Sequence, residues 1–482
     1  YLLWGNNNAS TSANTDLPSG YTGRLQKEWV VEMTGTVSNV HIEFDLTNGS
    51  PLAGDAAADY YLLVDADGDF TSGASATAAS SFSSNKVTFD DVNFSDGQYF
   101  TLATQKPGPG GVTSNLSFWL KADAGTSTTT DAAEVTSWTE QAGSVTNTGS
   151  AGSVPTYLES GINYNPSLNF DGSSESLTTN DLSNLPSGAE ERSLIIVGKL
   201  GSAPNDFRYA FSHGNNATSE GHGFGQSSTA LVASYNGRSN EAQSSNYFTL
   251  DDAFIGAGYY SGSHAVIGKD GELRDSTARS WNTKNSESGS VGKVGNWLGV
   301  GYYWQGEIAE IISFNERLGS VDRLKVMSYL GIKYGITQTV NNDGDGTSGQ
   351  TISGSITEGD YLDSDGSTVI WDYSAYSSYH YDIAGLGRDD NQGLHQKQSK
   401  SANSDAIVTM STEAIGTTNA GISTALTDGA YLLWGNNNAS SSNNTDLPTG
   451  YSGRTDKEWV VEMTGTVTNV HVEIDISNEK LA

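Results

Sequence analysis

The amino-acid sequence predicts an all-β protein that belongs to a tandem array. Gly, Ser, Thr and Asn are very frequent and Lys, Glu and Leu are sparse, which is typical of short strands joined by tight turns. Apolar residues fall in short runs that alternate with polar ones, as strands require. The segment YLLWGNNNAS at Tyr1 returns at Tyr431, and residues 431–482 repeat residues 1–52. We therefore expect the chain to be a window of a longer array, an organisation that serves reach and multivalency.

Length and charge narrow the classes of function. A chain of 482 residues with 10 Trp and 23 Tyr has enough apolar surface for several cores. The 56 acidic residues outnumber the 24 basic ones and give a net charge of −32, which excludes nucleic acid as a partner and favours divalent cations. No apolar run reaches the length of a membrane span, so direct membrane insertion is not expected. We expect an extracellular or cell-surface protein whose signal and anchor lie outside this sequence.

The first part of the chain, residues 1–105, is expected to be a β-domain portion. Apolar residues that alternate with polar ones, or that run in short blocks, predict five strands. They lie at WVVEMTG (Trp29), VHIEFDL (Val40), DYYLLVDAD (Asp59), KVTFDDVNF (Lys86) and QYFTLAT (Gln98). Residues 106–111 contain two prolines and three glycines, which sustain neither a strand ladder nor a helix. They are predicted to form a linker between domains.

Residues 112–337 carry a second set of strand-like phrases and one helix. The phrases are LSFWLKADAG, VTSWTEQAG, PSLNFDGSSESLTT and GEIAEIISFNERLG. A helix is expected over 320–334, with Ser320 as its cap and an apolar stripe that includes Leu324 and Met327. We interpret it as a cover on the strands; the alternative is a docking helix. In their order, these phrases resemble the laminin-G-like or concanavalin A-like jelly roll of large bacterial surface proteins, which implies an antiparallel two-sheet sandwich with a concave face.

Residues 338–482 contain the phrases GLGRDDNQGLHQKQS and YLLWGNNN. These phrases resemble the companion β-domain that follows such jelly rolls in giant secreted proteins. On this resemblance, residues 338–482 form the front portion of one companion domain and residues 1–105 the rear portion of the preceding one. The expected fold is therefore an all-β jelly roll with one covering helix, flanked by portions of a second β-sandwich-like domain in tandem array.

Three acidic turns are candidates for structural calcium. Oxygen ligands spaced by two residues, with a glycine at the sharp turn, suit a hard cation. The first turn is not an EF-hand, because Ala76 stands where its loop would need a twelfth-position acid. The alternative interpretation is a set of solvated β-turns in which Asp and Gly only satisfy the turn geometry. The predicted metal ligands are Asp65, Asp67, Asp69, Asp343, Asp345, Asp363 and Asp365.

Glycan binding is predicted at two aromatic phrases of the jelly roll. Aromatic rings offer stacking surfaces to sugars, and loops at one edge of such folds often present them. The alternative is that Trp304 and one of the neighbouring tyrosines belong to the core, because strand residues alternate between faces. The predicted ligand-binding residues are Tyr302, Tyr303 and Trp304 in GYYWQG, with His222 and Phe224 in GHGFG.

No catalytic residues are predicted. The sequence has no HExxH, GxSxG or phosphate-binding loop. The strand at Glu473 and Asp475 lacks the acid spacing of a glucanase site and lies outside the jelly roll. The chain is thus expected not to be an enzyme.

Together these patterns indicate a repeat unit of a giant extracellular bacterial adhesin or fibre. Its expected partners are neighbouring repeats of the same protein and polysaccharides or cell-surface glycans, with calcium bracing the loops. Two alternatives stay open, a subunit of a self-assembling extracellular filament and an accessory module of a secreted polysaccharide-degrading enzyme.

Overall fold

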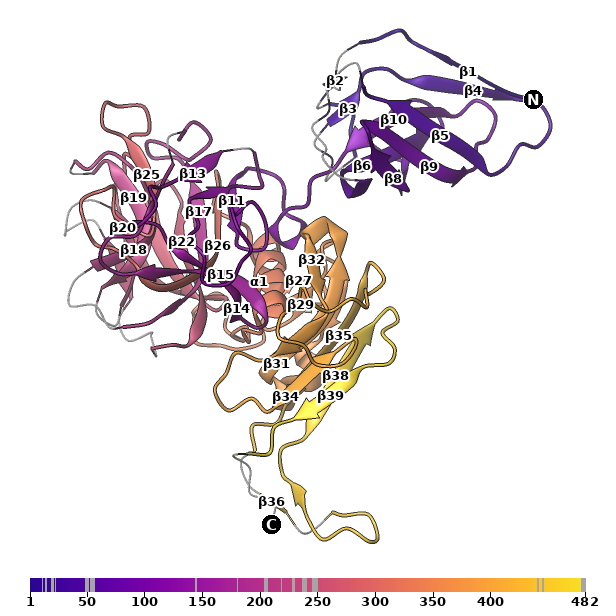
Figure 1. The fold of residues 1–482 in the computed structure, drawn as a ribbon. Coiled ribbons are helices and arrows are strands. Elements are labelled where there is room, and N and C mark those ends of the chain that lie inside the picture. The colour runs from indigo at the N-terminus through magenta and orange to yellow at the C-terminus, as the bar shows by residue number, and fades with distance from the viewer. Residues whose placement is uncertain are drawn as a thin grey trace. The chain divides into compact units, whose positions relative to one another are not determined.

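The computed structural model divides the chain into two compact units, Tyr1–Gly108 and Pro109–Ala482. It describes all residues except 11, 14, 19–20, 22, 48–51, 53–56, 144, 180, 203–206, 218, 228–229, 236–240, 245–249, 440–441, 444–445 and 478–482. Antiparallel strands dominate both units, which confirms the expected all-β fold (Figure 1). None of the helices in the described part of the chain has the length and apolar character needed to cross a membrane.

The first unit is formed by two small antiparallel sheets. One has the order β1-β4-β10-β3-β2, with β6 on β10 and β7 on β6, and the other has the order β5-β9-β8. The five predicted strands are confirmed as β4, β5, β6, β9 and β10. The elements are β1 (Leu2–Asn6), β2 (Ser12–Ala13), β3 (Gly23–Leu25), β4 (Trp29–Met33), β5 (Val40–Asp45), the 3-10 helix η1 (Ala57–Asp59), β6 (Tyr60–Asp65), β7 (Ser75–Ala78), β8 (Ser81–Ser83), β9 (Lys86–Val92) and β10 (Tyr99–Thr104).

The first unit's core lies between its two sheets. Val31 and Phe100 from the larger sheet meet Phe44 and Phe89 from the smaller one. Trp29 stacks on Phe100 with ring centroids 5.4 Å apart. The alternation of apolar residues along each strand thus places one face of each sheet in this core.

The jelly roll of the second unit consists of two eight-stranded sheets (Figure 1). The first has the order β14-β15-β26-β17-β22-β23-β24, with β11 also on β26, and the second has the order β12-β13-β16-β25-β18-β19-β20-β21. The first sheet contains β11 (Leu116–Lys121), β14 (Thr156–Ile162), β15 (Asn165–Asp171), β17 (Arg192–Leu200), β22 (Ala253–Tyr260), β23 (His264–Lys269), β24 (Glu272–Ala278) and β26 (Gln305–Phe314). The second contains β12 (Ser137–Thr139), β13 (Thr146–Thr148), β16 (Leu177–Thr179), β18 (Phe207–Gly214), β19 (Gly221–Ser227), β20 (Ala230–Tyr235), β21 (Ala242–Ser244) and β25 (Val291–Val294).

Successive side chains of β11 point to opposite faces, so the first sheet contributes to two cores, one on each of its faces. Phe118 and Leu120 point into the core between the sheets, whereas Trp119 belongs to the core on the outer face. On β26, Ile311 likewise faces inward and Ile312 outward. The first sheet is therefore apolar on both faces, and its outer face needs a cover.

Helix α1 (Ser320–Tyr334) provides that cover, with the predicted bounds. Gly319, rather than Ser320, occupies the N-cap position and makes no side-chain cap, while Gly335 ends the helix in a left-handed conformation (φ 65°) with its N–H bonded to Gly331. The sequence predicts one buried stripe on this helix, but more of its surface is buried, because α1 is also covered on its far side. The turn η2 (Pro109–Gly111) lies against α1, so the second half of the predicted linker is packed rather than free.

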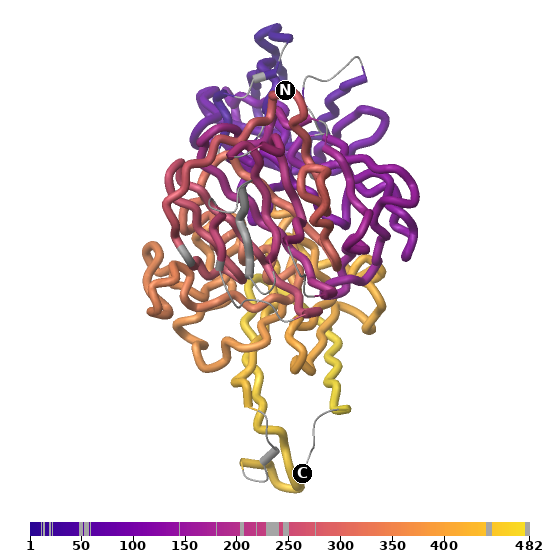
Figure 2. The backbone as a smooth tube through the Cα atoms, turned by 90° about the vertical axis from the view of Figure 1, so that its left-hand side faces the viewer, coloured from indigo at the N-terminus to yellow at the C-terminus, as the bar shows by residue number. Residues whose placement is uncertain are grey.

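The remaining strands of the second unit cover α1 from the other side. Their main sheets have the orders β32-β31-β35-β38 and β33-β34-β39. The last part of the chain, drawn in yellow, extends beyond the body of this unit (Figure 2). Tyr361, Trp371, Ile383 and Leu433 join the jelly-roll face and α1 in one apolar core. The elements are β27 (Thr351–Ser353), β28 (Ile356–Thr357), β29 (Tyr361–Leu362), β30 (Val369–Trp371), α2 (Tyr373–Tyr376), η3 (Ser377–Tyr379), β31 (Tyr381–Asp389), η4 (Asp390–Gln392), β32 (Leu394–Gln396), β33 (Gln398–Lys400), β34 (Val408–Ser411), β35 (Ala430–Asn436), β36 (Ser442–Asn443), β37 (Arg454–Thr455), β38 (Trp459–Thr464) and β39 (His471–Ile474).

Candidate functional site

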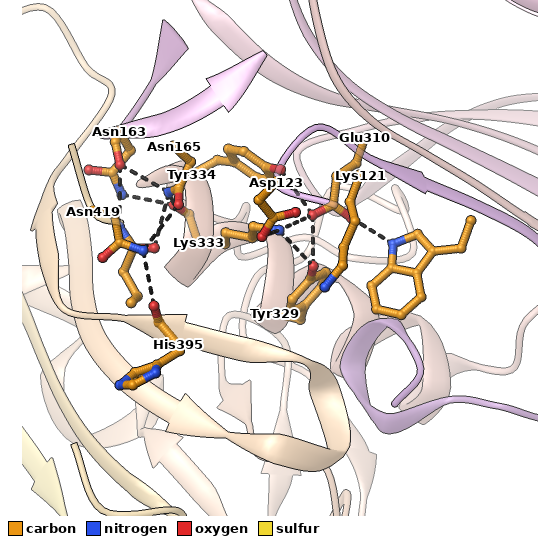
Figure 3. Close-up of polar contacts among 12 residues, drawn as sticks. Lys121, Asp123, Asn163, Asn165, Glu310, Tyr329, Lys333, Tyr334, His395 and Asn419 are labelled. Carbon is orange, nitrogen blue, oxygen red and sulfur yellow. Dashed lines mark hydrogen bonds and ion pairs between the residues drawn. The ribbon is translucent and has the colours of Figure 1, made fainter. Parts of the chain in front are cut away.

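A buried ionic cluster joins the jelly roll to helix α1 (Figure 3). Glu310 on β26 has no exposed surface, and its Oε1 lies 2.6 Å from the Nζ of Lys333. The same oxygen accepts hydrogen bonds from the hydroxyls of Tyr329 (2.7 Å) and Tyr334 (2.9 Å). Its Oε2 accepts the indole N–H of Trp119 at 2.9 Å. These four donors replace the hydrogen bonds to water that the Glu310 carboxylate loses on burial.

Asp123 adds a second carboxylate beside Lys333. Its Oδ2 lies 3.0 Å from Nζ, and its side chain keeps 33% of its surface exposed. Burial alone raises the pKa of Asp123, but Lys333 and Lys121 outweigh it and lower the pKa to about 2. Burial alone lowers the pKa of Lys333, but Asp123 and Glu310 outweigh it and raise the pKa. Both charges therefore persist at neutral pH.

A cluster of amides forms the second contact, between the tip of the β14–β15 hairpin and the β32–β33 segment (Figure 3). Asn163 donates from Nδ2 to the Oγ of Ser399 at 2.9 Å, and its Oδ1 accepts the N–H of Lys400 at 2.8 Å. Asn165 donates from Nδ2 to the Lys333 carbonyl (2.7 Å) and to Gln396 Oε1 (3.0 Å). The QKQS phrase thus receives the hairpin tip of the jelly roll.

The hairpin tip is shaped for this contact. Asn163 (φ 47°) and Tyr164 (φ 63°) both adopt left-handed conformations, as the two central residues of a type I′ turn do. Asn419 approaches from the other side and donates to Asn165 Oδ1 (3.3 Å) and to the carbonyl of His395 (3.0 Å). These amides were not singled out from the sequence, although the QKQS phrase itself was.

Both clusters are suited to holding elements in place rather than to chemistry. Glu310 is inaccessible, and each of its oxygens already accepts a hydrogen bond. Asn165 and Gln396 are buried as well. No substrate reaches these groups, so the clusters act as a structural lock at the junction.

An aromatic cluster on the outer face of the second jelly-roll sheet is the candidate ligand site. We call it the aromatic face; its residues are Phe207, Tyr209, Trp297 and Tyr302. The rings of Tyr209 and Trp297 lie 4.4 Å apart, and Tyr302 meets Phe207 edge-on at 6.1 Å. Tyr302 is 38% exposed, whereas Tyr209 and Trp297 are buried beneath the surface.

The GHGFG phrase forms the floor of the aromatic face. Phe224 points into the core between the sheets, so the glycines on either side of it point outward. A Cβ at Gly221 or Gly223 would lie 3.0 Å from the ring of Trp297. Glycine at these positions therefore allows the indole to lie against the strand.

The loop that carries Trp297 and Tyr302 is strained and pinned. Leu298 (φ 43°) and Tyr302 (φ 60°) both occupy the left-handed region that side chains other than Asn and Asp disfavour. The Tyr302 carbonyl accepts the N–H of Tyr209 at 3.0 Å, which fixes the loop to β18. Strained backbone of this kind is often retained at binding sites.

The structure separates the five predicted ligand-binding residues. Tyr302 is exposed and belongs to the aromatic face, whereas Tyr303 is half-buried and forms a backbone bridge with Tyr209. Trp304, His222 and Phe224 are buried in the jelly roll and offer no stacking surface, so the core interpretation holds for Trp304. Sequence reasoning missed Trp297, although it precedes GYYW in the same loop.

His222 belongs to a buried chain of polar groups. Its Nδ1 lies 3.2 Å from Nε2 of His213, whose Nδ1 lies 3.0 Å from Oδ1 of Asn285. Burial lowers the pKa of His213 to about 3, and burial together with Arg192 lowers that of His222. Both rings are therefore neutral at physiological pH.

The acidic turns use their carboxylates on their own backbone. Oδ1 of Asp65 accepts the N–H groups of Asp67 and Gly68, both at 2.8 Å, and Oδ1 of Asp67 accepts that of Asp69 at 3.0 Å. Asp69 in turn accepts the N–H of Thr71. This is the geometry of the alternative interpretation, in which the side chains satisfy the turn.

The other two turns follow the same pattern. Asp343 accepts the N–H of Asp345, and Asp363 accepts that of Asp365, each at 3.0 Å. Burial and Asp365 raise the pKa of Asp363 to about 7. Within the described part of the chain, no three His, Asp or Glu side chains are placed to share an ion. The arrangement as it stands does not fit a calcium ligand set.

A family model described as "Domain of unknown function (DUF8202)" matches residues 1–98 and 322–482, which is more than half of the chain. The chain belongs to this family. The DUF8202 match takes in α1 and the strands that follow it, together with most of the first unit, while the jelly-roll strands lie outside it. A comparison with curated protein sequences found no match.

Similar solved structures include carbohydrate-binding and sialidase domains. Domain 4 of AbnA, an extracellular arabinanase from Geobacillus stearothermophilus, solved with arabinotriose, is 14% identical, with 44% of this chain and 98% of that chain covered and a TM-score of 0.34. The CBM40 of a Ruminococcus gnavus sialidase, bound to α2,3 sialyllactose, is 12% identical, with 32% and 90% covered and a TM-score of 0.27. A Trypanosoma rangeli sialidase is 12% identical, with 65% and 52% covered and a TM-score of 0.33. TM-scores this low do not define a ligand for the DUF8202 chain.

Replacing Lys333 tests the ionic cluster. We expect Lys333→Met to lower the free energy of unfolding by about 3–5 kcal/mol, because it leaves a buried carboxylate without its cation. The control is Lys325→Met on the same helix, which removes an i,i+3 ion pair of 3.7 Å to Asp322 and should cost about 1 kcal/mol or less. Urea denaturation followed by tryptophan fluorescence measures both. Equal losses in the two variants would contradict the role given to Lys333.

The buried histidines predict a pH dependence. Below pH 6.5 the imidazole of His213 takes up a proton in the unfolded chain, whereas in the folded chain it stays neutral down to about pH 3. The free energy of unfolding therefore falls as the pH falls through this window. For His213 the loss is on the order of 2 kcal/mol between pH 6.5 and pH 5. We expect His213→Gln to flatten the curve of unfolding free energy against pH, whereas His264→Gln, at an exposed position, leaves it unchanged. An unaltered curve in His213→Gln would contradict this assignment.

Proposed function

We propose that the chain is a repeat of an extracellular surface fibre in which the jelly roll and the following strands form one stiff element. The observation that carries the proposal is the return of the Tyr1 segment at Tyr431, which marks a unit built to be repeated. The junction within the second unit supports stiffness. One apolar core, the ionic cluster at Lys333 and the amide cluster at Asn165 all cross it.

The acidic surface fits this role. With a net charge of −32, neighbouring fibres repel one another and stay separate, and phosphate backbones and anionic membranes are repelled as well. Display at the cell surface is part of the proposal.

A second function, glycan binding by the same repeat, is favoured by the aromatic face. Tyr302 presents an exposed ring on a pinned, strained loop, with three further rings around it. Aromatic rings bind sugars through stacking, and a weak contact gains strength when it is repeated along a fibre.

Surface labelling tests the fibre. Antibodies against the purified chain are expected to decorate intact cells along filaments, with gold particles at regular intervals in electron micrographs, because each copy of the repeat presents the same epitopes. Permeabilised cells serve as the control for internal protein. Label found only after permeabilisation would contradict surface display.

A glycan array tests the aromatic face. We expect the chain to bind a subset of printed polysaccharides and oligosaccharides, and Tyr302→Asn to weaken that binding about tenfold through the loss of one stacking ring. Asn tolerates the left-handed backbone at this position, so the loop should keep its shape. The matched control is Tyr451→Asn, which removes another exposed ring.

The array is run with calcium and with chelator, because the sequence predicted calcium at the acidic turns. The hydrogen bonds described above lead us to expect equal binding in both conditions. Binding that needs calcium, and is lost in Asp65→Asn but kept in the exposed control Asp91→Asn, would restore the calcium prediction.

Equal glycan binding by the Tyr302→Asn and Tyr451→Asn variants would contradict the assignment of the aromatic face as the glycan site.

A further inference from the structure

The second jelly-roll sheet, which carries the aromatic face, has no acidic residue on its strands. None of its eight strands contains Asp or Glu, in a chain that has 56 acidic residues. Strands of the first sheet do contain them, and these residues include Glu159, Asp171, Glu307 and Glu310. Negative charge is thus kept off the strands of the sheet that carries the aromatic face.

Lys293 on β25 lies on the outer side of this sheet, as the aromatic face does. Val294 belongs to the core between the two sheets, whereas Val291 packs against the aromatic face. Because successive side chains of a strand point to opposite faces, Lys293 shares the outer side with Val291. The side chain of Lys293 is half-buried there.

Strand pairing places Lys293 near the aromatic face. It lies opposite Thr178 on one neighbouring strand and opposite Ser212 on the other. Ser212 in turn lies opposite Gly223, the glycine against which Trp297 packs. Neighbouring strands are about 5 Å apart, so Lys293 lies about 10 Å from that glycine. A few linked sugars span this distance.

The loop of the aromatic face also touches the lysine. A Cβ at Gly299 would lie 3.5 Å from Cε of Lys293. Ser212 holds this loop over the sheet, because its Oγ accepts the N–H of Leu298 at 3.0 Å and donates to the Asn296 carbonyl at 2.7 Å. The lysine and the aromatic rings therefore belong to one surface of the sheet.

No carboxylate in the described part of the chain compensates the charge of Lys293. Its ammonium donates to Oγ1 of Thr178 at 2.6 Å, which uses one of its three donors on a neutral hydroxyl. Burial lowers the pKa of Lys293, and no described carboxylate acts in the opposite direction. An anion bound beside the ammonium would supply the missing partner.

We propose that the aromatic face binds polysaccharides whose sugars carry carboxylate groups, with Lys293 pairing with a carboxylate while Tyr302 stacks on a sugar ring of the same polysaccharide. The inference rests on the glycan binding proposed above and names the class of sugar. A carboxylate gains more from a partly buried ammonium than from an exposed one, because less water screens the pair.

The charge of the whole chain favours carboxylated over sulfated polysaccharides. A net charge of −32 repels a polyanion, and the repulsion grows with the number of charges that each sugar carries. A uronic acid has one carboxylate per sugar, which matches the single lysine on this surface. Heavily sulfated polymers carry more charge than Lys293 can pair with.

Paired polysaccharides test the proposal on the full chain. The probes are polygalacturonate, alginate and hyaluronate, each compared with its own methyl ester, which keeps the sugars and linkages but removes the charge. Biolayer interferometry with the immobilised chain measures the affinities. We expect at least one uronate to bind about tenfold more tightly than its ester, as a charge-assisted contact would give.

Three variants separate the two parts of the site. Lys293→Met should lower the affinity for the uronate to that of the ester and leave the ester unchanged, whereas Lys293→Arg should retain the preference for the uronate. Tyr302→Asn should weaken the uronate and the ester alike. The matched control is Lys325→Met, which removes a half-buried lysine from helix α1 on the outer side of the other sheet and should change neither affinity. Thermal melting confirms that each variant folds.

The outcomes distinguish this inference from the proposal on which it rests. Equal binding of every uronate and its ester, weakened by Tyr302→Asn, would overturn the carboxylate assignment and leave glycan binding in place. Equal losses of uronate binding in Lys293→Met and Lys325→Met would overturn the role of Lys293. Tighter binding of dextran sulfate than of any uronate would overturn the choice of carboxylate. No binding of any glycan, here or on the array, would overturn both.

Discussion

The pairing of the Glu310 carboxylate with Lys333 sets how helix α1 lies on the jelly roll, and the strands that follow α1 depend on that position. Glu310 comes from the middle of the longest strand of its sheet, so it cannot move without the core between the sheets. Lys333 comes from the last turn of the helix. Fixing these two points orients the whole far side of α1, against which Trp371 and Leu433 pack.

Much of the fold could be predicted from the sequence because local signals agree with the final structure. Gly335 marks the end of the helix, and alternating apolar residues locate the strands of the first unit. What could not be predicted is the two-sided burial of α1. The charge of Lys333 suggests a solvated face, yet the residue is buried and paired with Glu310, which lies on a strand before the helix. Tertiary pairing, not helix periodicity, determines its environment.

The candidate site was predicted less completely, for two physical reasons. The left-handed conformation at Leu298 and Tyr302 leaves no signature in residue types, so the loop that brings Trp297 beside Tyr209 could not be foreseen. In the acidic turns, alternating aspartates serve ion binding and turn geometry equally well. In this structure Asp65 accepts hydrogen bonds from the N–H groups of Asp67 and Gly68, which satisfies the turn geometry, and calcium at this turn stays a prediction.

Two hairpins of this chain share the same turn geometry and differ in what surrounds it. Ser84 and Asn85, between β8 and β9, are left-handed and exposed. Asn163 and Tyr164 are left-handed too, but their tip is held by Ser399 and Lys400. Hairpin tips are ordinarily where a protein accepts inserted residues. The tip at Ser84 and Asn85 can therefore accept a grafted epitope or fluorophore. An insertion at Asn163 and Tyr164 would instead separate the jelly roll from the strands that bind its hairpin tip.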